Sequence, residues 1–230
     1  MQRPEAGVEG AVAVAVAPGG ALAAPGADQP LDIALHYARH RARPARSSTL
    51  AVGARDESWS LNEALWHMPE RRQWSGVAGS EQPGINSVLI DPRNPSDIRI
   101  GVSCAGLWAS TDTGATWQII NDGMYNEYMP PERREDPIVQ DIHLLSRCAA
   151  RPEIVWCQHH KGVFRSEDAG ANWQEQTAIR PSKFGLAVAA HLRDPDTAWF
   201  VPAIKDVRRI PVDGKVVVAR TRDGGRSFEV

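Results

Sequence analysis

Cysteine is scarce in this sequence, which has three cysteines in 230 residues. An odd and low number does not make a disulfide framework, so we expect buried thiols in a reducing compartment. This favours a cytoplasmic protein. Secretion is the alternative, because the apolar run AVAVAVA at 11–17 is similar to a short signal segment, although acidic residues precede it where positive charge is expected.

Long apolar runs and an excess of charge of one sign are also missing. No stretch of about 18 apolar residues occurs, so no membrane-spanning helix is expected. The net charge of −2 gives no electrostatic reason to expect nucleic acid or an anionic membrane as a partner. No glycine-rich phosphate loop stands between a strand and a helix, so we predict no nucleotide site and no cofactor.

An eight-residue pattern is present three times. It reads STDTGATW at 110–117, SEDAGANW at 166–173 and TRDGGRSF at 221–228. The nearly even spacing of the three copies is typical of a repeated structural unit.

Short strand-like segments surround each copy, separated by turns rich in Pro, Asp, Gly and Asn. The expected strands are 49–54, 58–63 and 71–77; then 85–90, 98–104, 106–110 and 116–120; then 139–146, 153–160, 162–166 and 172–176; and finally 185–191, 197–204, 216–221 and 227–230. Each full unit is a four-stranded meander with the repeat between its third and fourth strands. Antiparallel four-stranded sheets repeated at this spacing predict an all-β fold, the β-propeller.

The expected organisation is a tail followed by an incomplete propeller of about three to four blades. Residues 1–48, rich in Ala, Pro and Arg, are expected to be disordered or weakly ordered. The propeller occupies 49–230, with a degenerate blade at 49–80, where Trp74 replaces the repeat aromatic, and blades at 84–122, 138–178 and 185–230. Because propellers have four to eight blades and open edges promote aggregation, we expect a truncated chain rather than an open arc.

The residues of the repeat are expected to be structural. The aspartates accept hydrogen bonds within their own turn, and the glycines adopt a positive φ. The hydroxyl residues connect the two strands, and the aromatic residues are expected to be buried between neighbouring sheets. The set is Ser110, Asp112, Gly114 and Trp117; Ser166, Asp168, Gly170 and Trp173; and Thr221, Asp223, Gly225 and Phe228.

These three copies resemble the Asp-box, or BNR repeat, S/T-x-D-x-G-x-T/S-W of sialidase-like and sortilin-like β-propellers. Asn172 and Phe228 depart from that pattern. The resemblance covers 49–230, where DPRNPSD and RDPDTAWF also look like bacterial BNR-repeat proteins often labelled exo-α-sialidase-like. In that family the box lies on the face away from the ligand-binding mouth, so the resemblance implies architecture rather than activity.

Ligand is therefore expected at the opposite mouth, where one connection, 121–141, is long. Long loops in compact domains are usually functional, and the alternative is a solvated charged insertion. Its candidate binding residues are Tyr125, Glu127, Tyr128, Glu132, Arg133, Arg134, Glu135, Asp136 and Asp141.

A histidine group is the second candidate site. His159 and His160 end one strand, and His143 lies on the neighbouring strand, with Cys157 nearby. A Cys/His metal site is conceivable, but adjacent residues on a strand point to opposite faces. We therefore predict ordinary strand-end histidines and no metal.

Two classes of function follow. The first is a scaffold that binds a glycan or a protein, including an assembly factor, and exposed Tyr125, Tyr128 or Phe184 at the mouth would favour it. The alternative is a sialidase-like glycoside hydrolase, for which the resemblance implies three arginines on the substrate carboxylate, a Tyr–Glu nucleophile pair and an aspartate acid/base. No such arginine triad is identifiable in the sequence, so no catalytic residue is predicted. The sequence also gives no indication of the oligomeric state.

Overall fold

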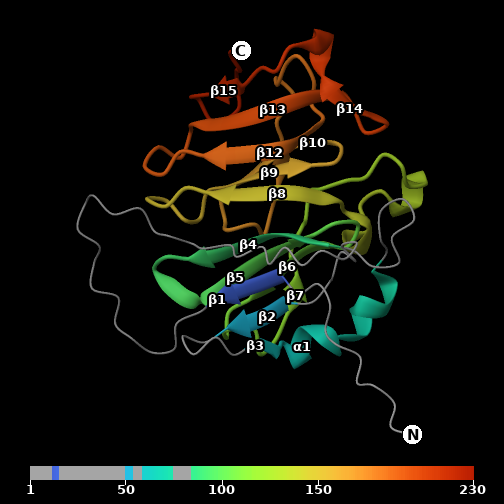
Figure 1. The fold of residues 1–230 in the computed structure, drawn as a ribbon, viewed down its shortest axis with the longest axis vertical. Coiled ribbons are helices and arrows are strands. Elements are labelled where there is room, and N and C mark those ends of the chain that lie inside the picture. Colours follow the sequence, from blue (N-terminus) through green and yellow to red (C-terminus); the bar gives the residue numbers. More distant parts are fainter. Residues whose placement is uncertain (1–11, 16–49, 54–58, 75–83) are drawn as a thin grey trace, which may run out of the picture.

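The computed structural model describes residues 12–15, 50–53, 59–74 and 84–230, with side chains described in 61–74 and 84–230. Within these residues, three four-stranded sheets follow one another along the molecule (Figure 1). The expected all-β fold of four-stranded antiparallel sheets is confirmed, and an incomplete propeller fits this arrangement.

Each four-stranded sheet is one blade. The first contains β4 (Ile85–Asp91), β5 (Asn94–Val102), β6 (Gly106–Ser110) and β7 (Gln118–Ile119). The second contains β8 (Ile142–Arg147), β9 (Val155–His159), β10 (Gly162–Ser166) and β11 (Gln174–Glu175). The third contains β12 (Gly185–Ala190), β13 (Ala198–Lys205), β14 (Arg208–Pro211) and β15 (Ala219–Thr221). The strand β14 was not expected, and the expected strand at 227–230 is reduced to a bridge between Arg220 and Glu229.

The first strands of successive blades lie side by side, β4 against β8 and β8 against β12. Side-chain hydrogen bonds join them: the Asn86 amide donates to the Ile142 carbonyl at 2.8 Å, and the Ser146 hydroxyl accepts from the Ala190 backbone N–H at 2.8 Å. This contact between first strands is what blades radiating from a common axis require.

The N-terminal part contains β1 (Val12–Ala15) parallel to β2 (Leu50–Gly53), which pairs with β3 (Trp59–Leu61). Residues 12–15 of the tail expected to be disordered or weakly ordered form β1, and the rest of 1–48 lies outside the described residues. The degenerate blade at 49–80 stays a prediction.

A helical segment follows β3, consisting of α1 (Glu63–Trp66) and the 3₁₀ helix η1 (Pro69–Gln73). The strand expected at 71–77 is wrong over 71–74, because Pro69 starts a helical turn there. Residues 75–77 lie outside the described part. No helix among the described residues is long and apolar enough to cross a membrane.

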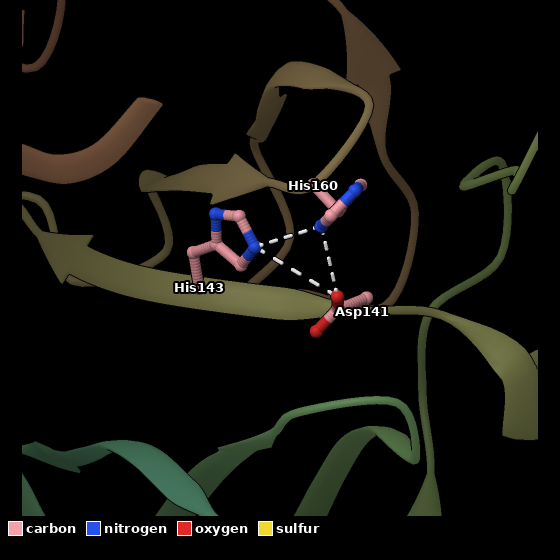
Figure 2. Close-up of side chains that lie close together, drawn as sticks. All are labelled: Asp141, His143 and His160. Atoms are coloured by element: carbon pink, nitrogen blue, oxygen red, sulfur yellow. Dashed lines mark hydrogen bonds and ion pairs between the residues drawn. The ribbon is translucent and has the colours of Figure 1, made fainter. Parts of the chain in front are cut away.

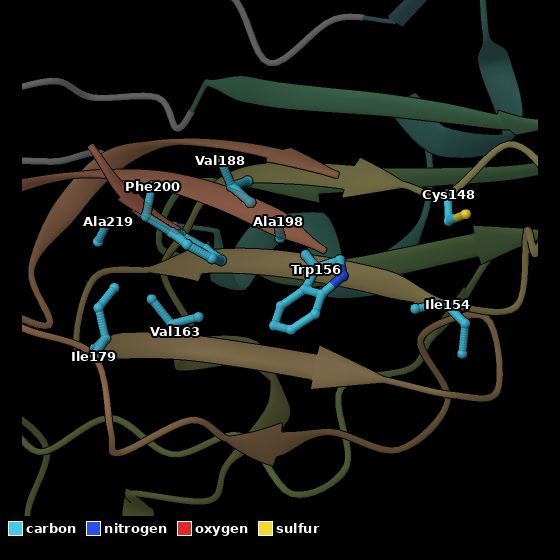
Figure 3. Packing of buried hydrophobic residues seen from close by; sticks show 9 residues of the cluster. All are labelled: Cys148, Ile154, Trp156, Val163, Ile179, Val188, Ala198, Phe200 and Ala219. Carbon is cyan, nitrogen blue, oxygen red and sulfur yellow. The ribbon is translucent and has the colours of Figure 1, made fainter. Parts of the chain in front are cut away.

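The cores lie between the blades. Figure 3 shows the cluster between the second and third blades, in which the rings of Trp156 and Phe200 meet edge to face with centroids 5.9 Å apart. Both side chains are almost completely buried. The expected thiol burial holds for Cys148 and Cys157, whereas Cys104 is half-buried.

The three repeat turns share one hydrogen-bond pattern. In the first, one Asp112 oxygen accepts from the Ser110 hydroxyl at 2.8 Å and from the Thr116 backbone N–H at 2.9 Å. The other oxygen accepts from the Thr116 hydroxyl at 2.6 Å. Asn172 departs from the pattern in the second copy, but its amide donates to Asp168 at 2.7 Å and preserves the bond.

The glycines of the turns have φ values of +85°, +96° and +94° at Gly114, Gly170 and Gly225, so the expected positive φ is confirmed. The aromatic expectation holds only in part. Trp173 is buried against the first blade, and its indole N–H donates to the Gly170 carbonyl. Trp117 and Phe228 are only half-buried.

These aspartates make the stability depend on pH. Hydrogen bonds, led by those from the side chains of Thr116 and Ser227, lower the pKa of Asp112 and Asp223 to about 2. An unfolded aspartate has a pKa of about 3.9, so the unfolded chain binds more protons between pH of about 4 and 2. The stabilisation is complete above this window and is lost as the pH falls through it.

We therefore expect the urea midpoint to fall as the pH is lowered through this window. A variant carrying Asp112→Asn and Asp223→Asn is expected to show a smaller pH dependence there. An unchanged slope in that variant would contradict the assignment.

Candidate functional site

The connections between strands lie on two opposite edges of the blades. The repeat turns contact the turns between first and second strands: the Ala169 backbone N–H donates to the Glu153 carbonyl at 2.8 Å, and that of Gly224 donates to the Asp196 carbonyl at 3.0 Å. We call this the repeat edge. The β5–β6, β9–β10 and β11–β12 connections lie on the other edge, together with the end of the connection 121–141. There the Gly106 backbone N–H donates to the Gln140 carbonyl and that of His160 donates to the Asp141 carbonyl, both at 2.9 Å. We call this the mouth edge.

Three predicted site residues converge at the mouth edge (Figure 2). Asp141 precedes β8, His143 lies in β8, and His160 follows β9. His160 Nδ1 lies 3.0 Å from Asp141 Oδ2 and 3.0 Å from His143 Nε2, and His143 Nε2 lies 3.7 Å from Asp141 Oδ2. Their side chains are only 6 to 10% exposed.

Groups from the other two blades hold this cluster. From the first, the Ser103 hydroxyl donates to Asp141 Oδ1 at 2.9 Å. From the third, the Gly185 carbonyl lies 2.7 Å from His143 Nδ1, and Asp206 Oδ2 lies 3.6 Å from His160 Nε2. The sequence provided no signal for these three partners, because each lies in a turn or at a strand end without a motif.

His159 does not belong to the cluster. Its ring is fully buried, and its Nε2 accepts from the backbone N–H of Asp141 at 3.0 Å. Burial lowers the pKa of His159 to about 3, which keeps the ring neutral. The backbone N–H of Lys161 faces Nδ1 at 3.1 Å, but a neutral imidazole accepts at only one nitrogen. His159 is thus a structural residue on the face opposite to His160.

The cluster also changes the acidity of neighbouring groups. Burial alone would raise the pKa of the Asp141 carboxyl, but the contacts with His143 and His160 outweigh burial and hold it well below its usual range. Burial, together with the negative charge of Asp141, raises the pKa of the Cys104 thiol to about 12. At neutral pH, Asp141 is a carboxylate and Cys104 is a thiol.

The connection 121–141 has a fixed stem. The Asn126 backbone N–H donates to the Arg134 carbonyl at 2.8 Å, and its side-chain amide donates to the Val139 carbonyl at 2.8 Å. The Gln140 amide donates to the carbonyls of Arg134 and Asp136 at 2.9 and 3.0 Å. Asn126 and Gln140, which donate these bonds, are buried.

The tip of the connection is exposed. Tyr128 is 55% exposed and lies edge to face against His160, and the Lys161 ammonium is 2.9 Å from its ring centroid. Glu127 lies 3.5 Å from the Lys183 ammonium. The remaining charged candidates, Glu132, Arg133, Arg134 and Glu135, are exposed, while Asp136 is half-buried.

The other aromatic candidates are less accessible than expected. Phe184 is buried, because it packs against both His143 and His160. Tyr125 is half-buried against Phe164, and its hydroxyl donates to Glu175.

The Tyr125 hydroxyl and the Glu175 carboxylate form a Tyr–Glu contact of the kind expected for the sialidase alternative. Burial, followed by the contact with Glu175, raises the pKa of the Tyr125 hydroxyl, so the hydroxyl is protonated at neutral pH. Glu175 lies in β11, the outer strand of its blade. Many of the ion-paired arginines among the described residues lie instead toward the repeat edge: Arg93, Arg99, Arg147, Arg151 and Arg165.

Known proteins resemble this chain in fold. No family model matches it, and the search of curated proteins found no match. Among solved structures, an ancestral GH74 enzyme is 16% identical and aligns over 81% of this chain and 24% of its own, with a TM-score of 0.51. YCF48 from Cyanidioschyzon merolae is 18% identical and aligns over 63% of this chain and 38% of its own, with a TM-score of 0.44.

A structure of YCF48 bound to D1 peptide is 16% identical over the same shares of the two chains, with a TM-score of 0.43. This chain therefore spans between 24 and 38% of the length of these structures. At these identities the likeness concerns the fold alone, which is of the β-propeller type.

Proposed function

We propose that this chain is part of an Asp-box β-propeller that binds another protein through its mouth edge. The observation that carries the proposal is the connection 121–141, whose stem is fixed by the buried Asn126 and Gln140 and whose charged tip is exposed. A loop that is already ordered loses little conformational entropy on binding, which favours affinity.

The Asp-box assignment is supported by the three repeat turns, which share their hydrogen bonds and their positive-φ glycines. Both carboxylate oxygens of each aspartate accept hydrogen bonds within the turn. These side chains therefore hold the turn, which is the structural role expected of the repeat.

A protein ligand fits the tip better than a glycan does. The tip presents both signs of charge, from Glu132 and Glu135 and from Arg133 and Arg134, beside the exposed Tyr128. Mixed charges around an aromatic residue suit complementary pairing with a protein surface. The sialidase alternative has less support, because Glu175 lies in the outer strand of its blade.

A charge-reversal variant tests this function. We expect Glu132→Lys with Glu135→Lys to reduce retention of a cellular protein partner by at least about tenfold, because tip charges set partner choice. The measurement is quantitative mass spectrometry of proteins retained on the immobilised chain, with a glycan array and a fluorogenic sialoside assay in parallel.

The control is Glu167→Lys with Glu229→Lys, which makes the same change in net charge at exposed positions of the repeat edge. Because it breaks the ion pairs of Glu167 with Arg165 and of Glu229 with Arg220, retention is compared per folded molecule. Partners kept by the wild type and by this control, but lost by the tip variant, are the expected result. Equal retention by the two variants, or sialoside turnover, would contradict the proposal.

A further inference from the structure

We propose that Asp141, His143 and His160 bind a divalent transition metal ion at the mouth edge, and that zinc is the preferred ion. Two imidazole nitrogens and one carboxylate oxygen form a ligand set that suits zinc. Figure 2 shows the three side chains turned toward one another. This site goes beyond the protein-binding function and does not depend on it.

The spacing of the ligand atoms fits a metal. His143 Nε2, His160 Nδ1 and Asp141 Oδ2 lie 3.0, 3.0 and 3.7 Å apart. Tetrahedral zinc with bonds of about 2.0–2.1 Å separates its nitrogen and oxygen ligands by about 3.3 Å. The observed triangle is close to one face of that tetrahedron.

Outer contacts orient each ligand in the way that metal sites require. The Gly185 carbonyl, 2.7 Å from His143 Nδ1, places a proton on that nitrogen and leaves the Nε2 lone pair facing the cluster. The Ser103 hydroxyl and the Cys104 backbone N–H both donate to Asp141 Oδ1, which leaves Oδ2 free to face the two histidines.

The surroundings of His160 disfavour a cluster in which both histidines are neutral and no metal is bound. If His160 Nδ1 carried the only proton, its Nε2 lone pair would face the Asp206 carboxylate at 3.6 Å, and these two acceptors repel each other. That buried Nε2 has no hydrogen-bond partner among the described residues. A metal on Nδ1 places the proton on Nε2, where Asp206 attracts it.

A second proton on His160 is the competing arrangement, because an imidazolium would lie between Asp141 and Asp206. In that arrangement the N–H on His160 Nδ1 is shared between Asp141 Oδ2 and the His143 Nε2 lone pair, each 3.0 Å away. Since both arrangements place positive charge between the same carboxylates, metal content and affinity must distinguish them.

Three protein ligands leave one coordination position of a tetrahedral ion for water or another donor. The exposed Tyr128 lies against His160 with ring centroids 5.2 Å apart, so the cluster lies directly beneath the proposed binding tip.

The experiment uses the full chain, freed of metal by EDTA and then titrated with Zn²⁺ or Co²⁺. We expect one equivalent of metal per chain, the visible absorption bands of four-coordinate cobalt, and a higher melting temperature with zinc. His143→Gln and Asp141→Asn are each expected to weaken zinc binding by more than about a hundredfold, and Asp206→Asn by about tenfold.

His67→Gln is the matched control, because His67 is exposed and is outside the cluster; it is expected to bind zinc like the wild type. Binding of much less than one equivalent by the wild type would overturn the proposal and favour the imidazolium, as would equal affinity in His143→Gln and Asp141→Asn. If those variants fail to fold, the cobalt spectrum and the zinc-dependent melting shift of the wild type decide, and the lack of either overturns the proposal.

Discussion

A Trp156→Ala variant is expected to lose about 3–5 kcal/mol of unfolding free energy. Trp156 is fully buried between the second and third blades, where its ring meets Phe200 at 5.9 Å and its indole N–H donates to the Pro195 carbonyl at 3.3 Å. Alanine leaves a cavity and an unpaired carbonyl. Urea unfolding followed by circular dichroism measures the loss.

Trp199→Ala is the matched control, since Trp199 neighbours Phe200 on β13 but points to the opposite, partly exposed face. Trp199→Ala is expected to lose clearly less unfolding free energy than Trp156→Ala. Equal losses in the two variants would mean that the interface between the two blades is not the core described above.

Replacement of Gly123 by alanine is expected to cost about 2–4 kcal/mol, the sum of backbone strain and overpacking. Gly123 has a φ of +85°, and a Cβ there would lie 2.3 Å from the Trp173 carbonyl oxygen. The adjacent Asp122 carbonyl accepts from the Trp173 backbone N–H at 2.8 Å, so the clash would separate the first blade from the second repeat turn. The same urea titration measures this effect.

Gly214→Ala separates the two contributions. Gly214 has a φ of +68°, but a Cβ there would meet nothing within 4 Å, so only the backbone strain is expected. If Gly123→Ala costs no more than Gly214→Ala, the close approach to Trp173 carries no energetic weight.

The repeat turns could be predicted from the sequence because their interactions are local. The carboxylate of Asp112 bonds only to residues within four positions of it. The same reasoning failed at 71–74, where Pro69 starts a helical turn in a segment with strand-like spacing. It also failed at Phe184, whose burial depends on His143 and His160 from another blade.

The individual residues of the Asp141–His143–His160 cluster could be predicted from the sequence, but their proximity could not. Asp141, His143 and His160 were each candidates, yet only the pairing of β8 with β9 brings their side chains together. Ser103 and Asp206 come from the neighbouring blades, and that contact depends on how blades pack. The sequence analysis predicted no metal because His159 and His160, as neighbours on a strand, point to opposite faces; the set of Asp141, His143 and His160 needs only one of them.

We expect the repeat edge to maintain the shape of the molecule and the mouth edge to bind the partner. The most direct test compares partner retention per folded molecule in Asp168→Ala, which removes the turn aspartate of the second blade, and in Glu132→Lys with Glu135→Lys. We expect Asp168→Ala to lower the melting temperature while folded molecules keep the partner, and the tip variant to melt like the wild type and lose it. Loss of the partner by folded Asp168→Ala, with full retention by the tip variant, would contradict the account.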